Sequence, residues 1–89
     1  MNNQVKQETR DAFLEFIVSQ YRKERAEYES EDGGLETLSK LQFALRHNVS
    51  PATMETYLNG RSIPNWASLV KLEQEFPGII NVMVEAESE

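Results

Sequence analysis

The chain has no cysteine and a single histidine, so it offers few residues for cross-links or for soft metal ligands. Without cysteine it can form neither a disulfide framework nor a thiolate zinc site, and it does not require an oxidising compartment. Long hydrophobic runs are missing too: the longest, at residues 13–18, is interrupted by Glu15 and is far too short to span a bilayer. No cationic segment followed by an apolar one resembles a leader peptide. We therefore expect a soluble, cytoplasmic protein with no metal and no cofactor.

The length also leaves little room for an enzyme. Eighty-nine residues form one domain with a single small core, and a closed active-site pocket needs more. A catalytic triad or general base would have to use His47, which has no second histidine and no evident pair of carboxylates near it. Gly33-Gly34 lacks the lysine and the flanking strand of a phosphate-binding loop. We predict that the protein is not an enzyme, and that His47 caps a helix or touches a phosphate.

The first helix is predicted over residues 8–30, after a loose lead-in at 1–7. Apolar residues recur there at steps of three and four, the spacing of one helix face; they are Phe13, Leu14, Phe16, Ile17, Val18, Tyr21 and Tyr28. Acidic residues 29, 31 and 32 are unfavourable at a helix C-terminus, and Gly33-Gly34 lets the chain turn. The charged run at 24–32 is typical of a solvated helix surface; an acidic face that mimics DNA is the other interpretation.

Two more helices are predicted within residues 36–58, joined by a tight turn. Leu38, Leu41, Ala44 and Leu45, with Phe43 alongside, have helical spacing within 35–47. Asn48 tolerates a left-handed backbone, Val49 can reach the core, and Ser50-Pro51 is typical of an N-cap and a first helical residue. The third helix should cover 51–58, with Met54, Tyr57 and Leu58 buried, and end at Asn59-Gly60.

The last part of the chain contains a fourth helix and a segment of different character. Pro64 opens a helix at 64–76 whose inner side carries Trp66, Leu69, Val70, Leu72 and Phe76. Residues 79–84 are rich in β-branched side chains and are predicted to be extended, and 85–89 to be a flexible acidic tail. The predicted fold is a single all-α domain of four to five helices, with an elongated first helix and a short extended C-terminal segment.

The strongest signal is the fixed spacing inside residues 36–58. A small residue at 44 allows close helix crossing, a left-handed residue follows four positions later, and apolar residues stand at 49 and 54. Together with the turn at 61–64 and the helix after it, this pattern resembles the lambda-repressor and Cro-like helix-turn-helix domains, also called the XRE family. The resemblance covers about residues 37–76. It implies a lambda-repressor-like fold whose third helix enters the major groove of DNA.

The resemblance also implies which side chains touch DNA. Base edges would be faced by Ala52, Glu55 and Thr56, with Pro51 at the edge of the groove. The phosphate backbone would be contacted by Lys40, Ser50, Thr53, Asn59, Arg61 and Asn65. The third helix departs from the family pattern because it has no glutamine, arginine or lysine for a bidentate base contact. Readout would rest on methyl groups, hydroxyls and one carboxylate.

Basic residues are scarce over the whole chain but not in the motif. Nine basic against fifteen acidic residues give a formal charge of −6, a poor fit to a protein that simply coats phosphate. From 37 to 72, however, four basic residues (Lys40, Arg46, Arg61 and Lys71) stand against Glu55 alone. The acid therefore lies in the flanks, and we expect orientation on a duplex with modest affinity and salt dependence.

These observations predict a sequence-specific DNA-binding transcriptional regulator of bacterial or phage type, such as a repressor, bound to an inverted-repeat operator as a homodimer. Segment 79–84 would close the dimer by strand pairing through Ile79, Ile80, Val82 and Val84, or else fold back over the helices. The alternative function is a protein-binding module, such as an antirepressor, an antitoxin or a polymerase-binding factor, that uses the first helix and the acidic surface.

Overall fold

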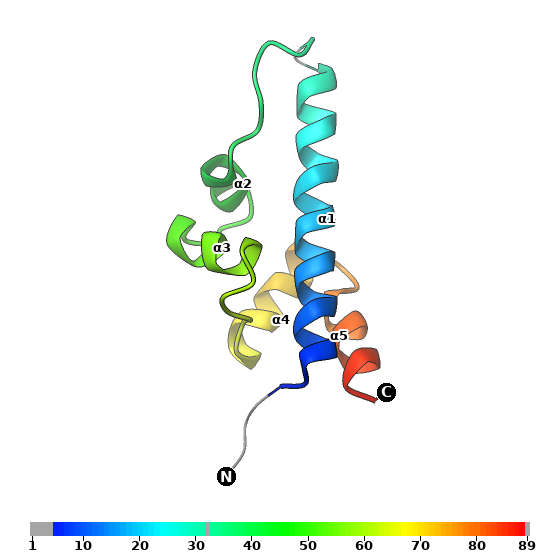
Figure 1. Ribbon diagram of the computed structural model, residues 1–89. Coiled ribbons are helices and arrows are strands. Elements are labelled where there is room, and N and C mark those ends of the chain that lie inside the picture. The colour runs from blue at the N-terminus through cyan, green and yellow to red at the C-terminus, as the bar shows by residue number, and fades with distance from the viewer. Residues whose placement is uncertain (1–4, 32, 89) are drawn as a thin grey trace.

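The computed structural model describes residues 5–31 and 33–88, and all of the regular structure within them is helical. The helices are α1 (Gln7–Glu31), α2 (Lys40–Arg46), α3 (Pro51–Leu58), α4 (Trp66–Glu75) and α5 (Ile79–Ser88), as Figure 1 shows. The predicted all-α class is confirmed for this part of the chain. Of the predicted features, residues 1–4 of the lead-in, Asp32 and Glu89 lie outside the described residues. No described helix combines the length and the apolar character needed to cross a membrane.

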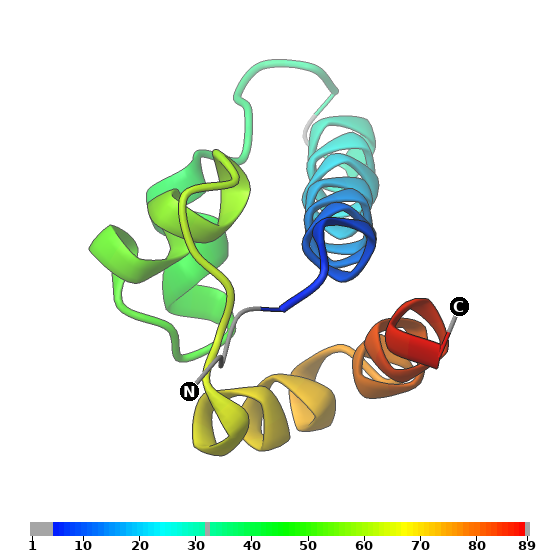
Figure 2. The same cartoon turned by 60° about the horizontal axis from the view of Figure 1, so that its bottom comes forward.

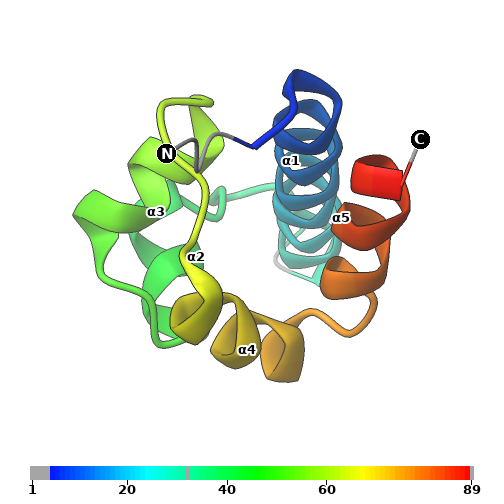
Figure 3. The same cartoon turned by 90° about the horizontal axis from the view of Figure 1, so that it is seen from below.

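The long helix α1 is the axis on which the other helices are arranged. Its 25 residues account for the elongated shape of the molecule, which measures 50 × 23 × 21 Å. In Figures 1 and 2, α2 and α3 lie on one side of α1, and α5 runs beside its N-terminal part. The view from below in Figure 3 shows α4 joining these two groups. The core lies in the space that the five helices enclose.

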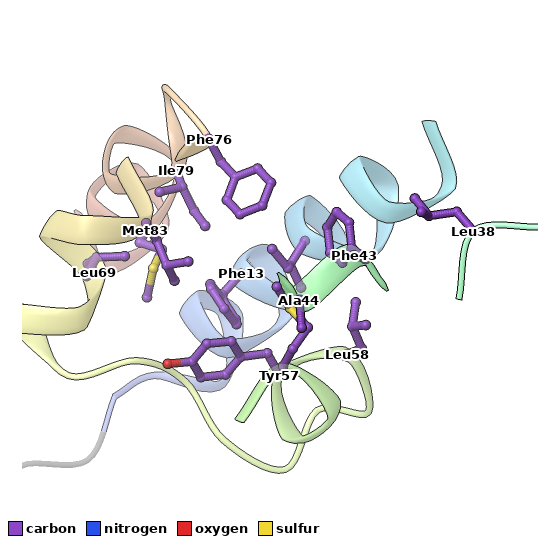
Figure 4. Packing of buried hydrophobic residues seen from close by; sticks show 13 residues of the cluster. Phe13, Leu38, Phe43, Ala44, Tyr57, Leu58, Leu69, Phe76, Ile79 and Met83 are labelled. Carbon is purple, nitrogen blue, oxygen red and sulfur yellow. The ribbon is translucent and has the colours of Figure 1, made fainter. Parts of the chain in front are cut away.

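The core is formed by one side of each helix (Figure 4). Its buried apolar side chains are Phe13, Ile17, Leu38, Phe43, Ala44, Met54, Tyr57, Leu58, Leu69, Leu72, Phe76, Ile79 and Met83. The ring of Phe13 on α1 meets the ring of Tyr57 on α3 edge-on, with centroids 5.3 Å apart. Complete burial of one such side chain stabilises the fold by about 1.5–3 kcal/mol. The predicted burial of Met54, Tyr57 and Leu58 is confirmed.

Helix α2 is shorter than predicted because it begins at a strong cap. The Ser39 hydroxyl oxygen accepts from the Gln42 backbone N–H at 3.1 Å, and the Gln42 side-chain oxygen accepts from the Ser39 N–H at 2.9 Å. The residues before this cap are held along α1, where the Tyr21 hydroxyl donates to the Leu38 carbonyl at 2.8 Å.

Fewer residues of α2 are buried than the sequence pattern predicts. Phe43 and Ala44 are fully buried, whereas Leu41 and Leu45 are 54% and 63% exposed. The helix predicted from their spacing is confirmed, but these two leucines do not lie on its buried face. With only seven residues, α2 turns just these two side chains toward the body of the molecule, and the leucines one turn apart lie outside that contact.

Helix α4 begins at Trp66, after the N-cap Asn65, rather than at Pro64. Leu69, Leu72 and Phe76 are buried as predicted, but Trp66 is 67% exposed and Val70, predicted on the same inner side, is 39% exposed. The prediction of an inner position for Trp66 is wrong, although its spacing of three from Leu69 favoured it. In Figures 1 and 3 the first turn of α4 lies on the α3 side of the molecule, away from α1 and α5, so the helices that cover the rest of α4 do not cover this turn.

Residues 79–88 form helix α5, so the predicted extended segment at 79–84 and the predicted flexible tail beyond it are wrong for the described residues. The Glu73 carboxylate caps this helix by accepting from the N–H groups of Gly78 and Ile80, both at 2.9 Å. At the other end, the Glu87 carboxylate accepts from the Thr9 hydroxyl and the Lys6 N–H. These contacts, together with packing along α1, outweigh the preference of β-branched residues for strands.

Pairing of two strands at 79–84 is excluded along with the extended conformation. Ile79 is fully buried and cannot contact a second copy. Ile80 and Val82 are half-buried, and Val84 is 53% exposed. Any dimer contact here must use the outer face of a helix.

We expect acid to loosen the start of α5. Hydrogen bonds from Gly78 and Ile80 lower the pKa of Glu73, so its ionised form stabilises the helix start at neutral pH, and this contribution is lost as the pH falls through the lowered pKa. In a Glu73→Gln variant, the amides of Ile80 and Val82 should show lower protection from hydrogen exchange at neutral pH than in the parent protein. The difference should shrink in acid, where the parent carboxyl is protonated.

The matched control is Glu27→Gln, because Glu27 is exposed and makes no hydrogen bond or ion pair within the described residues. It should leave the protection of α5 unchanged. Equal protection of α5 in the Glu73→Gln and parent proteins at neutral pH would show that this cap does not hold the helix.

Candidate nucleic-acid interface

The connection between α2 and α3 has the geometry that the sequence predicts. Asn48 has a φ of 60°, and among the described residues the others with positive φ are glycines. The N–H of Val49 donates to the carbonyl of Ala44 at 3.0 Å, which closes the turn directly after α2. Val49 is half-buried and packs against the core. The predicted left-handed turn and the buried small residue at position 44 are both confirmed.

Helix α3 begins sharply after this turn and leaves one face uncovered. The Ser50 hydroxyl oxygen accepts from the Thr53 N–H at 3.2 Å, and Pro51 occupies the first turn. Because Met54, Tyr57 and Leu58 point into the core, the outward face consists of Pro51, Ala52, Thr53 and Glu55, all exposed. These four are among the residues that the sequence predicts at a DNA interface, and the structure brings them together on one surface.

Thr56 is placed differently from the other predicted base-facing residues. It is half-buried, its hydroxyl donates to the Thr53 carbonyl at 2.8 Å, and it lies 2.6 Å from the Ser62 hydroxyl oxygen. The backbone N–H groups of Arg61 and Ser62 both donate to the Thr56 carbonyl, at 2.9 and 3.3 Å. Thr56 therefore anchors the loop after α3, and its hydroxyl is already used inside the protein.

The residues predicted to contact the DNA backbone lie at the ends of helices. Lys40 is exposed at the first position of α2, and Arg61 is exposed in the turn after α3. The side-chain oxygen of Asn59 accepts from the Arg61 N–H at 3.0 Å, and that of Asn65 accepts from the Ser68 N–H at 2.9 Å, so each amide keeps its NH₂ group for another partner. Ser50 and Thr53 bond to one another at 3.1 Å.

The loop after α3 is also held close to α1. Gly60 has a φ of 80°, and a Cβ there would stand 3.3 Å from a methyl carbon of Leu14. The left-handed backbone and the tight approach both favour glycine at this position. Arg61 is thereby placed immediately beyond the C-terminal end of α3.

The positive charge of this region is only partly neutralised by the protein. Arg46 lies 3.5 Å from the Glu24 carboxylate. Lys40, Arg61 and Lys71 have no ion pair among residues 5–31 and 33–88. Lys71 lines a groove of about 500 Å³ between the α2–α3 turn and α4, together with Ser50, Thr53, Tyr57 and Ser68. The groove thus joins polar groups at the start of α3 to Lys71 on α4, and Glu75 lines it as well.

His47 contacts carboxylates on both α1 and α4, which the sequence did not predict. Its Nδ1 lies 2.8 Å from a carboxylate oxygen of Glu75, and its Nε2 lies 2.8 Å from one of Glu24. The ring also packs between those of Phe43 and Phe76, with centroids 5.1 and 4.3 Å away. The prediction that no carboxylate pair lies near His47 is wrong, because the pair comes from α1 and α4. No local spacing links residues 24, 47 and 75, so only the fold could reveal it.

No family model, curated protein or solved structure matches this chain. The interpretation of the surface therefore depends on its own geometry: an exposed helix start, a fixed turn before it, and cations at its edges.

The left-handed backbone at residue 48 can be tested by substitution. Asn48→Ala should lower the free energy of unfolding by about 1–2 kcal/mol, because alanine in a left-handed backbone is strained. For a domain of this size that corresponds to a fall of about 4–16 °C in the melting temperature. Asn48→Gly, measured in the same thermal denaturation, should be close to the parent protein. Equal melting temperatures for the alanine and glycine variants would contradict the left-handed turn.

His47 should matter for stability through two separable contributions. His47→Phe keeps a ring between Phe43 and Phe76 but removes both hydrogen bonds to carboxylates, which we expect to cost about 1–3 kcal/mol in free energy of unfolding. His47→Ala removes the ring contacts as well and should cost more. Chemical denaturation of both variants measures the difference. A His47→Phe protein as stable as the parent would show that the carboxylate contacts contribute nothing.

Proposed function

We propose that the chain is a helix-turn-helix protein of the lambda-repressor and Cro-like type that binds double-stranded DNA sequence-specifically and regulates transcription. The observation that carries the proposal is the uncovered outward face at the start of α3, which directly follows the left-handed turn at Asn48. In this proposal α3 lies in the major groove, where its first residues reach base edges.

Base readout would depend mainly on Ala52 and Glu55. The Ala52 methyl group can contact the methyl group of a thymine, and the Glu55 carboxylate can accept from the amino group of a cytosine. Thr56 contributes less than the sequence predicts, because its hydroxyl is bonded to Thr53 and close to Ser62. When it faces a base edge, Glu55 contributes to specificity. When it faces a phosphate, the same carboxylate would repel the DNA.

Groups at the edges of α3 would position the protein on the DNA backbone. Lys40 and Arg61 supply positive charge, and the NH₂ groups of Asn59 and Asn65 supply donors. Ser50 and Thr53 lie at the start of α3, near the same groove as Lys71. With so few cations, binding should have a small salt slope and modest non-specific affinity.

A homodimer would give this small interface useful affinity by placing two α3 helices about one DNA turn apart on an inverted repeat. The candidate contact is the outer side of α5, where Ile80 and Val84 lie one turn apart. Val84 is 53% exposed in the single chain, and Ile80 is half-buried. Bound at a promoter, such a dimer would act by occlusion or by recruitment.

A second candidate function is suggested by two neighbouring leucines. Leu41 and Leu45 stand one turn apart on the outside of α2, both more than half exposed, and a partner protein could cover them. The chain would then use the same fold as a protein-binding module. The net charge of −6 is in line with this alternative.

Selection from a random duplex pool at near-physiological salt tests DNA binding without a guess about the operator. We expect an inverted repeat to be enriched, and on it Lys40→Ala and Arg61→Ala should each weaken binding to all duplexes about equally and lower the salt slope by about 1. Glu55→Gln should instead change the preference at one base position. Fluorescence anisotropy of labelled duplexes measures both effects.

Lys23→Ala is the matched control, because Lys23 is an exposed cation on α1, a helix outside the proposed interface. It should leave affinity and salt slope nearly unchanged. Failure to enrich any sequence, with no binding of the pool, would reject the proposed function and favour the protein-binding module.

A further inference from the structure

Trp66 is the one tryptophan of the chain, and the fold leaves it largely in water. It is the first residue of α4 and is 67% exposed, although a tryptophan side chain is usually well buried. Val70, one turn further along α4, is also exposed. The core is filled without either side chain. Trp66 and Val70 on the first two turns of α4 therefore present apolar surface to water.

The stretch of sequence around Trp66 carries charge of one sign. Residues 56–72 include Arg61 and Lys71 and no acidic residue, in a chain whose net charge is −6. The next two acidic residues of α4 are held by the protein: Glu73 caps α5, and Glu75 bonds His47. Trp66 is an exposed apolar ring, and the nearest cations along the sequence, Arg61 and Lys71, have no ion pair within the described residues. This combination suits a ligand that has both negative charge and apolar surface.

The position of Trp66 places it at the edge of the proposed DNA interface. The loop that leads to α4 is anchored on α3, since Arg61 and Ser62 donate to the Thr56 carbonyl. Asn65, a predicted backbone contact, is the residue immediately before Trp66 and caps the same helix. Figures 1 and 3 show the start of α4 on the α3 side of the molecule, away from α1.

We propose that Trp66 contacts the DNA backbone beside the groove that α3 enters, with its indole ring on a deoxyribose and its N–H donating to a phosphate oxygen. An indole has an apolar face and a single donor, and a deoxyribose next to a phosphate offers an apolar face and an anionic acceptor. In this proposal Arg61 and Lys71, five residues to either side of Trp66 in the sequence, neutralise nearby phosphates. The assignment rests on the proposed function and extends the interface from α3 to α4.

The test uses the fluorescence of the single tryptophan in the intact chain. On titration with the duplex enriched by selection, Trp66 emission should change and saturate with the same Kd as the anisotropy of the labelled duplex. Trp66→Ala should weaken binding about tenfold on all sequences alike, as the loss of about 1.4 kcal/mol predicts, and Trp66→Phe should weaken it less. Circular dichroism should show unchanged helix content, because the side chain is exposed.

Leu35→Ala is the control, since Leu35 is also a strongly exposed apolar residue but lies outside this surface. It should bind like the parent protein. The proposed Trp66 contact is rejected if the parent binds the duplex while Trp66 emission stays constant. It is also rejected if Trp66→Ala binds as tightly as the parent. In both cases DNA binding stands. A Trp66 emission that shifts with protein concentration without DNA would assign this surface to a second copy. If the parent protein binds no duplex, the proposed function itself is rejected.

Discussion

The burial of Phe43 is the interaction on which the rest of the structure depends. Helices α2 and α3 are too short to form a core of their own, and Phe43 joins them to the body by packing against Tyr21 of α1 and against Phe76 after α4, with centroids 5.1 and 5.8 Å apart. His47 adds hydrogen bonds to carboxylates on the same two helices. Since α3 follows α2 after a fixed turn, its outward face is oriented by this aromatic junction.

The long helix α1 serves two purposes along its length. Its N-terminal part supplies Phe13 and Ile17 to the core and packs along α5, while its C-terminal part holds the segment before α2 through the Tyr21 hydroxyl. Seven of the fifteen acidic residues of the chain lie on α1, whereas residues 56–72 carry none. Residues 37–72, with four basic residues against Glu55, are therefore locally basic within an acidic chain, and α4 continues beyond them into Glu73 and Glu75.

The errors of the sequence predictions have two causes, and the first is that periodicity cannot tell how far a core extends. Trp66 and Leu45 have helical spacing from buried residues, yet they lie beyond the helices that could cover them. The β-branched segment at 79–84 predicted a strand, but Glu73 and Glu87 cap and tie its two ends as a helix. The contacts of Glu87 with Lys6 and Thr9 join the two ends of the described chain and leave no trace in local spacing. The second cause is that such tertiary contacts override propensity.

The sequence by itself determined the helical class, the bounds of α3 and the left-handed turn at Asn48, because each depends on residues within a few positions of one another. It also identified most of the residues that lie exposed at the start of α3. Only the tertiary structure decided that α5 is a helix, that His47 joins two carboxylates, and that Trp66 stays in water. These features depend on which helices meet in space, and local side-chain preferences do not specify that.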